Sequence, residues 1–460
     1  MTQITIIGAG SVMFTRQITS ALLSYPALND IDLVLMDIDP EVLKRSHQLI
    51  SKMAEQANTR ARISMTTDRR VALTGADFVI NAIQVGGLEP WRLDMQIPTK
   101  YGVIQEVGDT MGPGGIFRAL RHIPPMLAIL RDMEEVCPEA LFINYANPLA
   151  PLTWAAKDSS PIKSIGLCYG VRYTAAQLVG YLGEGDWVEH PSTPERWQRL
   201  MYHDVPSHID YEFAGINHMT WITKMMANGK DMQPKIRELV NNPKVYAADG
   251  VRCEVLKFFG LWCTENHWHC SDYLPYFRKN EEMINHFLPQ RWDLLALEEK
   301  VHSAGEAEID AQLAGIQKFT IEPNMLNAPK LINAMVSGER TRINGNVPNR
   351  QSVGLLIDNL PENCVVEVPI WVDNQGIHPQ KMGRLPMQCA SLIKTNTAVQ
   401  ELIVEAALTC NLDAARYALA LDPVTATVCT LEQIDAMFTE MFTAQRQWLP
   451  QFANVPSTSL

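Results

Sequence analysis

Three short apolar runs of the chain each end in polar side chains that could do chemistry. Asn147, Cys168 and His218 follow these runs in order along the sequence. A thiolate and an imidazole together can bind a divalent cation and leave coordination positions free for substrate oxygens. Alone, however, a cysteine or a histidine at such a place is usually a buried structural side chain. Neither Cys168 nor His218 stands in an HxH or CxxC spacing, so spacing alone does not decide between a metal site and a structural role.

A fourth polar cluster is the loop from Val107 to Gly115, which contains Asp109 and several glycines. Glycine lets backbone amides come close to a ligand, so the loop is a candidate part of a binding site. Asn217, directly before His218, is a further candidate ligand-binding side chain.

The elements that must position these residues alternate between apolar strands and helices. Such alternation predicts βαβ units with right-handed connections, and therefore a doubly wound parallel sheet. Active sites of such sheets lie beyond the carboxyl ends of the strands, where the polar clusters occur. The expected strands are Ile4–Ile7, Ile31–Met36, Arg62–Thr66, Ala76–Gln84, Leu141–Tyr145 and Ser164–Cys168, and the expected helices run to Leu23, over Glu41–Glu55 and over Ile116–Val136.

The turn after the first strand, Gly8-Ala-Gly10-Ser11, is typical of dinucleotide binding. Its glycines allow a tight turn and a close approach of the pyrophosphate to the next helix. The third glycine position of the fingerprint is Met13, so the motif is incomplete. Asp37 ends the second strand, where a carboxylate accepts the ribose hydroxyls and repels a 2′-phosphate, which favours NAD over NADP. The simpler interpretation is an ordinary turn, with Asp37 capping the next helix.

The length and composition limit the classes of function. A chain of 460 residues predicts two parts, an NAD-binding Rossmann-like domain over 1–200 and a mixed α/β lobe over 201–460. The second lobe should contain helices at Asp293–Lys318 and Glu401–Leu421 and strands at Arg340–Asn346 and Val365–Val372. A net charge of −12 argues against nucleic acid and anionic membranes as partners. Nine scattered cysteines and no secretion signal indicate a cytoplasmic protein.

Runs of residues along nearly the whole chain resemble glycoside hydrolase family 4, the NAD- and Mn²⁺-dependent glycosidases, and most closely the melibiase-type branch. The matching runs are Gly8–Ser11, Leu35–Pro40, Asp109–Gly115, Asn144–Pro148, Ala214–His218, Thr264-Glu265, Asp272–Phe277, Ile357–Pro361, Val366–Val368 and Asp373–Gly376. The resemblance implies a lactate/malate dehydrogenase-like architecture and a homodimer or homotetramer.

The resemblance also implies a mechanism without net oxidation. NAD takes hydride from C3 of the sugar, a base removes the C2 proton, the C1 oxygen leaves, water adds and the hydride returns; this family is an exception to two-carboxylate hydrolysis. Mn²⁺ would polarise the C2 and C3 oxygens.

On this resemblance, Cys168 and His218 fall on the Mn²⁺ ligands and Asn147 on a substrate-binding position. Glu265 falls on the C2 base, with His267, His269, Asp272 and Tyr273 as competitors. Asn217 and His267 are further expected substrate contacts, and Asp109 is an expected catalytic residue.

Two features depart from the family pattern. Tyr169 follows Cys168 where relatives acting on α-glucosides and α-galactosides usually have His. Either this phenol is the acid in an altered setting, or the leaving group needs less help from an acid. The absence of Asp or Asn there argues against a 6-phosphate substrate, which leaves an unphosphorylated α-galactoside, α-glucoside or α-glucuronide. The segment Gly183–Pro206 is also longer than expected, and predicts either an oligomer contact or a cover for the leaving group.

Two other classes of protein remain as alternatives. An NAD-dependent dehydrogenase of the lactate and malate type would need an arginine to hold a carboxylate, and Arg118 and Arg121 follow the glycine loop. A redox-sensing NAD-binding protein would leave the Cys168, His218 and Asn147 set unexplained.

Overall fold

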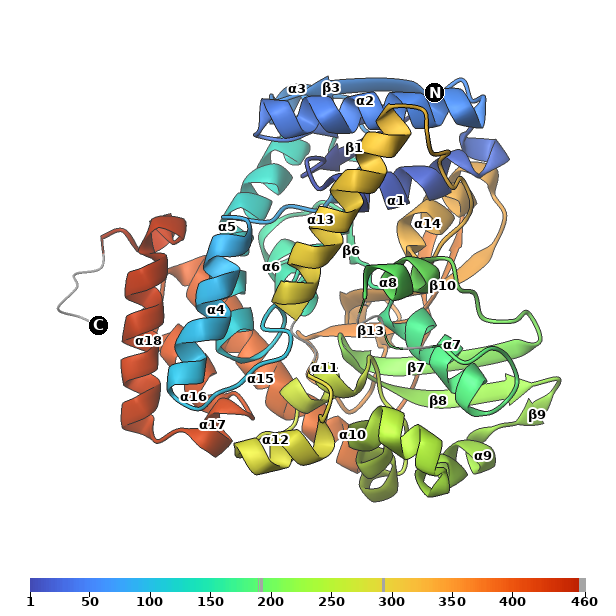
Figure 1. The fold of residues 1–460 in the computed structure, drawn as a ribbon. Coiled ribbons are helices and arrows are strands. Elements are labelled where there is room, and N and C mark those ends of the chain that lie inside the picture. The colour runs from blue at the N-terminus through green and yellow to red at the C-terminus, as the bar shows by residue number, and fades with distance from the viewer. Residues whose placement is uncertain (189, 191–192, 292–293, 455–460) are drawn as a thin grey trace.

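A twelve-stranded sheet runs through the computed structural model in the order β3-β2-β1-β4-β5-β6-β10-β13-β7-β8-β9, with β14 beside β13. The structure describes residues 1–460 except 189, 191–192, 292–293 and 455–460. Helices cover this sheet on both sides (Figure 1). The expected α/β class with a doubly wound sheet is confirmed.

The first half of the sheet is parallel. Its strands are β1 (Thr2–Ile7), β2 (Ile31–Met36), β3 (Arg62–Thr66), β4 (Phe78–Asn81), β5 (Leu141–Asn144) and β6 (Ser164–Gly166). Every residue of β4 and β5 is buried, as expected for strands covered on both faces. The connecting helices are α1 (Val12–Leu23), α2 (Pro40–Ala57), α3 (Arg69–Leu73), α4 (Leu88–Lys100), α5 (Gly112–Val136), α6 (Leu149–Ser159) and α7 (Gly170–Tyr181). The strands predicted from the apolar runs are confirmed, with ends that differ by a few residues.

The second half of the sheet is antiparallel and joins the first half directly. Asn346 of β10 (Thr341–Pro348) pairs with Gly166 of β6, so one sheet crosses the boundary expected near residue 200. The other strands are β7 (Ile209–Ile216), β8 (Met219–Ala227), β9 (Lys230–Asp231), β13 (Val365–Asp373) and β14 (Gly376–Pro379), and β11 (Arg350–Gln351) pairs with β12 (Gly354–Leu355) apart from this sheet. His218 lies in the tight turn of the β7–β8 hairpin, which the sequence did not predict.

The helices between α7 and β10 pack against both halves of the molecule. They are α8 (Pro194–Met201), α9 (Gln233–Glu238), α10 (Pro243–Phe259), α11 (His267–Asp272), α12 (Glu281–Phe287), α13 (Leu294–Leu313) and α14 (Asn327–Ser337). Helix α13 contacts α2 and α4 of the parallel half, and α14 contacts β10 and β13. Helix α13 crosses in front of the parallel half toward α4 and α8 (Figure 1). Short 3₁₀ turns lie at Pro26–Leu28, Leu239–Asn241, Arg446–Trp448 and Pro450–Phe452.

The last helices correct one prediction. The helix expected over Glu401–Leu421 is two helices, α15 (Met387–Thr409) and α16 (Leu412–Leu421). Cys410 between them is left-handed, with φ of 58°, and the Asn411 side chain accepts hydrogen bonds from the first amides of α16. The chain therefore ends one helix and caps another at a point where the apolar pattern continues unbroken. Helices α17 (Thr425–Val428) and α18 (Leu431–Gln445) complete the fold.

A buried ion pair fastens α18 to the parallel half. Arg121 on α5 pairs with Asp94 on α4, and both side chains are fully buried. Gln445 on α18 accepts from Arg121 at 2.8 Å and donates to Asp94 at 2.8 Å. Arg121, a candidate carboxylate clamp in the dehydrogenase alternative, therefore has a structural role. Among the described residues no helix is long and apolar enough to span a membrane.

Candidate active site

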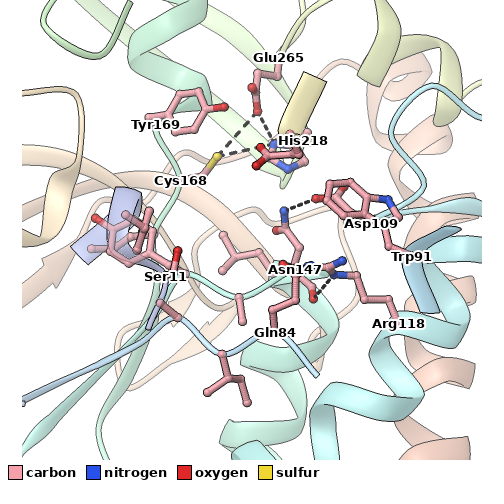
Figure 2. A pocket seen from close by; sticks show the side chains of 18 of the residues that line it. Ser11, Gln84, Trp91, Asp109, Arg118, Asn147, Cys168, Tyr169, His218 and Glu265 are labelled. Carbon is pink, nitrogen blue, oxygen red and sulfur yellow. Dashed lines mark hydrogen bonds and ion pairs between the residues drawn. The ribbon is translucent and has the colours of Figure 1, made fainter. Parts of the chain in front are cut away.

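The carboxyl ends of the parallel strands and the β7–β8 turn open into one cavity of about 320 Å³. Figure 2 shows Asn147 and Asp109 on one side of it and Cys168, His218 and Glu265 on another. Its lining comes from both halves of the chain: Ser11, Phe14, Gln17, Ala82, Ile83, Gln84, Leu88, Trp91, Asp109, Arg118, Tyr145, Ala146, Asn147, Leu149, Leu167, Cys168, Tyr169, Trp197, His218, Glu265, His269 and Glu298.

Cys168, His218 and Glu265 form the most concentrated group of ligand atoms in this cavity. His218 Nδ1 lies 2.7 Å from Glu265 Oε2, and Cys168 Sγ lies 3.7 Å from each of these atoms. The three side chains are buried, and their ligand atoms lie within 4.8 Å of one another. One sulfur, one nitrogen and one oxygen at this spacing suit a first-row divalent cation. The sequence had suggested Cys168 and His218; the structure adds Glu265 to them.

Charge in this group is strongly coupled. Burial alone would raise the pKa of Glu265, but His269 and His218 lower it to about 2. Burial opposes protonation of His218, yet Cys168 and Glu265 raise its pKa well above the ordinary value. Burial is the main reason why the pKa of Cys168 is raised. These shifts favour a protonated His218 beside an ionised Glu265, and a divalent cation bound here would take over the positive charge.

Asn147 and Asp109 face this group across the cavity. The Asn147 amide donates to Asp109 Oδ2 at 2.7 Å, and Thr110 donates to Asp109 Oδ1 at 2.7 Å. Both donors hold the Asp109 carboxylate, which is buried, in one orientation. The Asn147 carbonyl oxygen accepts from Arg118 at 3.2 Å, which also holds the backbone at this strand end.

The glycine turn packs closely against β4 and Asp37. Gly8 has a φ of 87°, and a Cβ there would lie 2.7 Å from the Ala82 carbonyl oxygen. Gly10 donates its amide hydrogen to Asp37 Oδ2 at 2.7 Å. The helix α2 is capped by Asp39, whose side chain accepts from the first amides, so the capping role considered for Asp37 is wrong. Ser11 does not cap α1 with its side chain, which leaves the first amides of that helix available to a phosphate.

Tyr169 contributes a phenol ring to the cavity wall. Burial, followed by the charge of Glu265, raises its pKa well above the ordinary value. The ring meets Trp197 edge to face, with centroids 5.7 Å apart. Trp197 belongs to α8, within the long segment 183–206, so this segment contributes the side chain of Trp197 to the lining of the cavity.

Two cavity residues were not expected from any motif as parts of a sugar site. Arg118 is 6% exposed, stacks on Trp91 at 5.2 Å, and its Nη1 has no hydrogen-bond partner among the described residues. Glu298 on α13 reaches the same cavity, and burial, with the nearby Asp109, raises its pKa to about 7. Glu298 lies inside a long helix, and no sequence motif surrounds it. Only the crossing of α13 over the sheet therefore shows that this side chain reaches the cavity.

Two expected substrate contacts do not line the cavity. Asn217 is 1% exposed and donates to Glu367 on β13 at 3.3 Å, so it lies behind His218. His267 packs against Trp268, with ring centroids 3.7 Å apart. On the short helix α11, the side chain that reaches the cavity is His269, whose ring lies 4.6 Å from that of His218. A helical turn places residues two positions apart on different faces, so on α11 it is His269 and not His267 that faces the cavity.

Comparison with known proteins places this geometry in a family. Residues 3–184 match the model of a family described as "Family 4 glycosyl hydrolase", and residues 213–425 match the model described as "Family 4 glycosyl hydrolase C-terminal domain". The chain is 36% identical to an alpha-galactosidase of Bacillus subtilis over 98% of this chain and 100% of that protein. It is 34% identical to an alpha-galactosidase of Rhizobium meliloti over 98% of this chain and 90% of that protein. The crystal structure of a 6-phospho-alpha-glucosidase from gut microorganisms, in complex with NAD and Mn²⁺, superposes with a TM-score of 0.76 at 20% identity, covering 98% of this chain and 99% of that one.

Proposed function

Because the chain belongs to family 4 of the glycosyl hydrolases, we propose that it hydrolyses an unphosphorylated α-glycoside with NAD and Mn²⁺, and that an α-galactoside is its first candidate substrate. The family membership favours this function over the dehydrogenase alternative. Two relatives at 34% and 36% identity are named alpha-galactosidases, which supports the choice of sugar. The observation that carries the proposal is the Cys168, His218 and Glu265 group facing Asn147 and Asp109 across one cavity.

The residues present fit both cofactors. Cys168 and His218 would hold Mn²⁺, because their sulfur and nitrogen atoms lie 3.7 Å apart and are buried. The turn at Gly8 and Gly10 would hold the NAD pyrophosphate, since it leads into α1, whose first amides have no side-chain cap. When bound, NAD supplies a reversible hydride acceptor and Mn²⁺ supplies positive charge at the sugar oxygens.

The side chains around the cavity would orient the sugar and move its protons. Glu265 is ionised, because its pKa is lowered to about 2, so its carboxylate can accept the C2 proton. Asn147 is held by Asp109 and can donate its second amide hydrogen to a sugar hydroxyl. Arg118 Nη1, which has no partner among the described residues, points to a further sugar oxygen.

The leaving group would lie against Tyr169 and Trp197. A phenol whose pKa is raised is a weak acid, so Tyr169 would donate a hydrogen bond to the departing oxygen instead of transferring a full proton. Good leaving groups such as aryl oxides need no more than this. We therefore expect activity to fall as the pKa of the leaving alcohol rises.

The remaining proposals concern the organisation of the protein. We propose the division into an NAD-binding part over 1–200 and a substrate part over 201–460, a cytoplasmic location and a homodimer or homotetramer. Size-exclusion chromatography with light scattering would determine the number of subunits.

A cofactor omission experiment tests the main proposal. The purified protein would be assayed with p-nitrophenyl α-galactoside, α-glucoside and α-glucuronide, with NAD and Mn²⁺ present together, singly or not at all. Release of nitrophenol that needs both cofactors, without accumulation of NADH, is the expected result. Accumulation of NADH without release of nitrophenol would show a dehydrogenase instead.

A further inference from the structure

Two buried thiols flank the segment that carries Glu265 and His269. Cys263 Sγ lies 3.2 Å from Cys270 Sγ, and the two residues are 1% and 2% exposed. Both are free cysteines. The family mechanism uses neither of them, and their separation is already far below that of ordinary unrelated core side chains.

The backbone holds both cysteines in this arrangement. Cys263 forms a bridge with Trp221 of β8, and hydrogen bonds of 2.9 Å on either side, from Ile222 to Trp262 and from Thr264 to Thr220, tie it to that strand. Cys270 lies on α11, where its amide donates to the Asn266 carbonyl oxygen at 3.0 Å. The two sulfurs therefore face each other from a sheet edge and a helix, and neither depends on a loose loop.

We propose that Cys263 and Cys270 are a modification site that peroxide converts reversibly to a disulfide, and that this disulfide lowers turnover at the neighbouring active site. In the first step one sulfur attacks a peroxide oxygen, which gives a sulfenic acid and releases water. In the second step the other thiol attacks that sulfur, and a second water leaves. In total the two thiols lose two protons and two electrons, and hydrogen peroxide is reduced to two waters.

The effect on turnover follows from what lies between the two cysteines. A disulfide has a sulfur separation of about 2.05 Å, so the sulfurs must approach by roughly 1.1 Å from their 3.2 Å contact. Glu265 and His269 both line the cavity and both lie within the closed segment 263–270. The Glu265 carbonyl oxygen accepts from Arg252 and Thr174 at 2.8 Å each, so a movement of this segment would disturb the hydrogen bonds that position Glu265. A displacement near 1 Å at an active site can cost on the order of 100-fold in rate.

The effect on activity rests on the proposed glycosidase function, whereas disulfide formation does not. Trypsin should release residues 258–278 as one peptide, because Lys257 and Arg278 bound it, and this peptide contains no cysteine other than Cys263 and Cys270. The full-length enzyme with Mn²⁺ and NAD would be freed of reductant, exposed to hydrogen peroxide, alkylated and analysed by mass spectrometry and by nitrophenol release. Cys270→Ser is the test variant, and Cys410→Ser, which removes an exposed thiol, is the matched control.

In wild type and in Cys410→Ser, the mass of this peptide should fall by two hydrogens, and activity should fall in parallel by at least about tenfold. Dithiothreitol should restore both the mass and the activity. Cys270→Ser should keep its activity under the same exposure. Absence of the mass loss in wild type would overturn the proposal. Equal inactivation of Cys270→Ser would also overturn it, because oxidation of Cys168 would then be the cause. If Cys270→Ser melts well below wild type, Cys263→Ser provides the same test, because it removes the other cysteine of the proposed disulfide. A reduced wild-type enzyme without activity would refute the proposed function and leave the mass measurement intact.

Discussion

Replacing Glu265 by glutamine tests the proton-transfer role most directly. The amide keeps the shape of the carboxylate but removes the charge that lies 2.7 Å from His218 Nδ1. A positioned general base contributes about 10²- to 10⁴-fold to a rate. The pKa of Glu265 is lowered to about 2, and a base this weak is poorly matched to neutral pH. We therefore expect the lower end of that range, about 100-fold in kcat, or about 2.7 kcal/mol in activation free energy.

The assay must separate loss of the base from loss of a metal ligand. We would measure kcat with p-nitrophenyl α-galactoside at saturating NAD while the Mn²⁺ concentration is raised stepwise. Glu282→Gln, an exposed glutamate on α12, is the control for the substitution itself. Cys168→Ser provides the comparison for a lost ligand. If Glu265 is the base, kcat of Glu265→Gln stays low at every Mn²⁺ concentration.

Two results would refute this reasoning. An unchanged kcat at every Mn²⁺ concentration would show that Glu265 is neither the base nor a needed metal ligand. Recovery of full activity at high Mn²⁺ would show that Glu265 acts only by holding the metal. Glu265→Asp, which withdraws the carboxylate by about 1.5 Å, should keep more activity than Glu265→Gln if the charge is what matters.

Three further predictions address the cofactor, the fold and pH. Asp37→Ala removes a carboxylate that would accept the ribose hydroxyls, so KM for NAD should rise at least about tenfold and discrimination against NADP should fall, measured by activity against each nucleotide. Asp94→Ala leaves Arg121 buried without its carboxylate, so the free energy of unfolding should fall by about 3 to 5 kcal/mol in urea denaturation; a smaller loss would mean that Gln445 suffices as a partner. Burial raises the pKa of Glu298 to about 7, so ionising it disfavours the folded state and stability is lost as pH rises from about 4.5 through 7. Glu298→Gln should therefore lose less thermal stability than wild type between about pH 5 and pH 8, and parallel curves would contradict this.

The parallel half of the fold could be predicted from the sequence because its signals are local. Apolar runs such as the one that forms β5, Leu141–Asn144, give strands in which every residue is buried, and Gly8 has a φ of 87°, a conformation that only glycine adopts easily. The break between α15 and α16 was missed, because the apolar pattern continues through it and only the left-handed Cys410 and the Asn411 cap end one helix and begin the next.

The candidate site also has a part that could be predicted from the sequence and a part that could not. The sequence by itself determined which polar side chains lie at the strand ends, since Asn147, Cys168 and His218 each follow a strand and the strand ends of one sheet converge. The family resemblance added Glu265 and several competitors, and only the tertiary structure decided which of these side chains lie in the cavity. Glu265 reaches His218 from a segment after α10, His269 replaces His267 because of the turn of α11, and Glu298 arrives on a helix that crosses the sheet. These contacts join residues far apart in sequence, and local patterns carry no information about how distant segments pack.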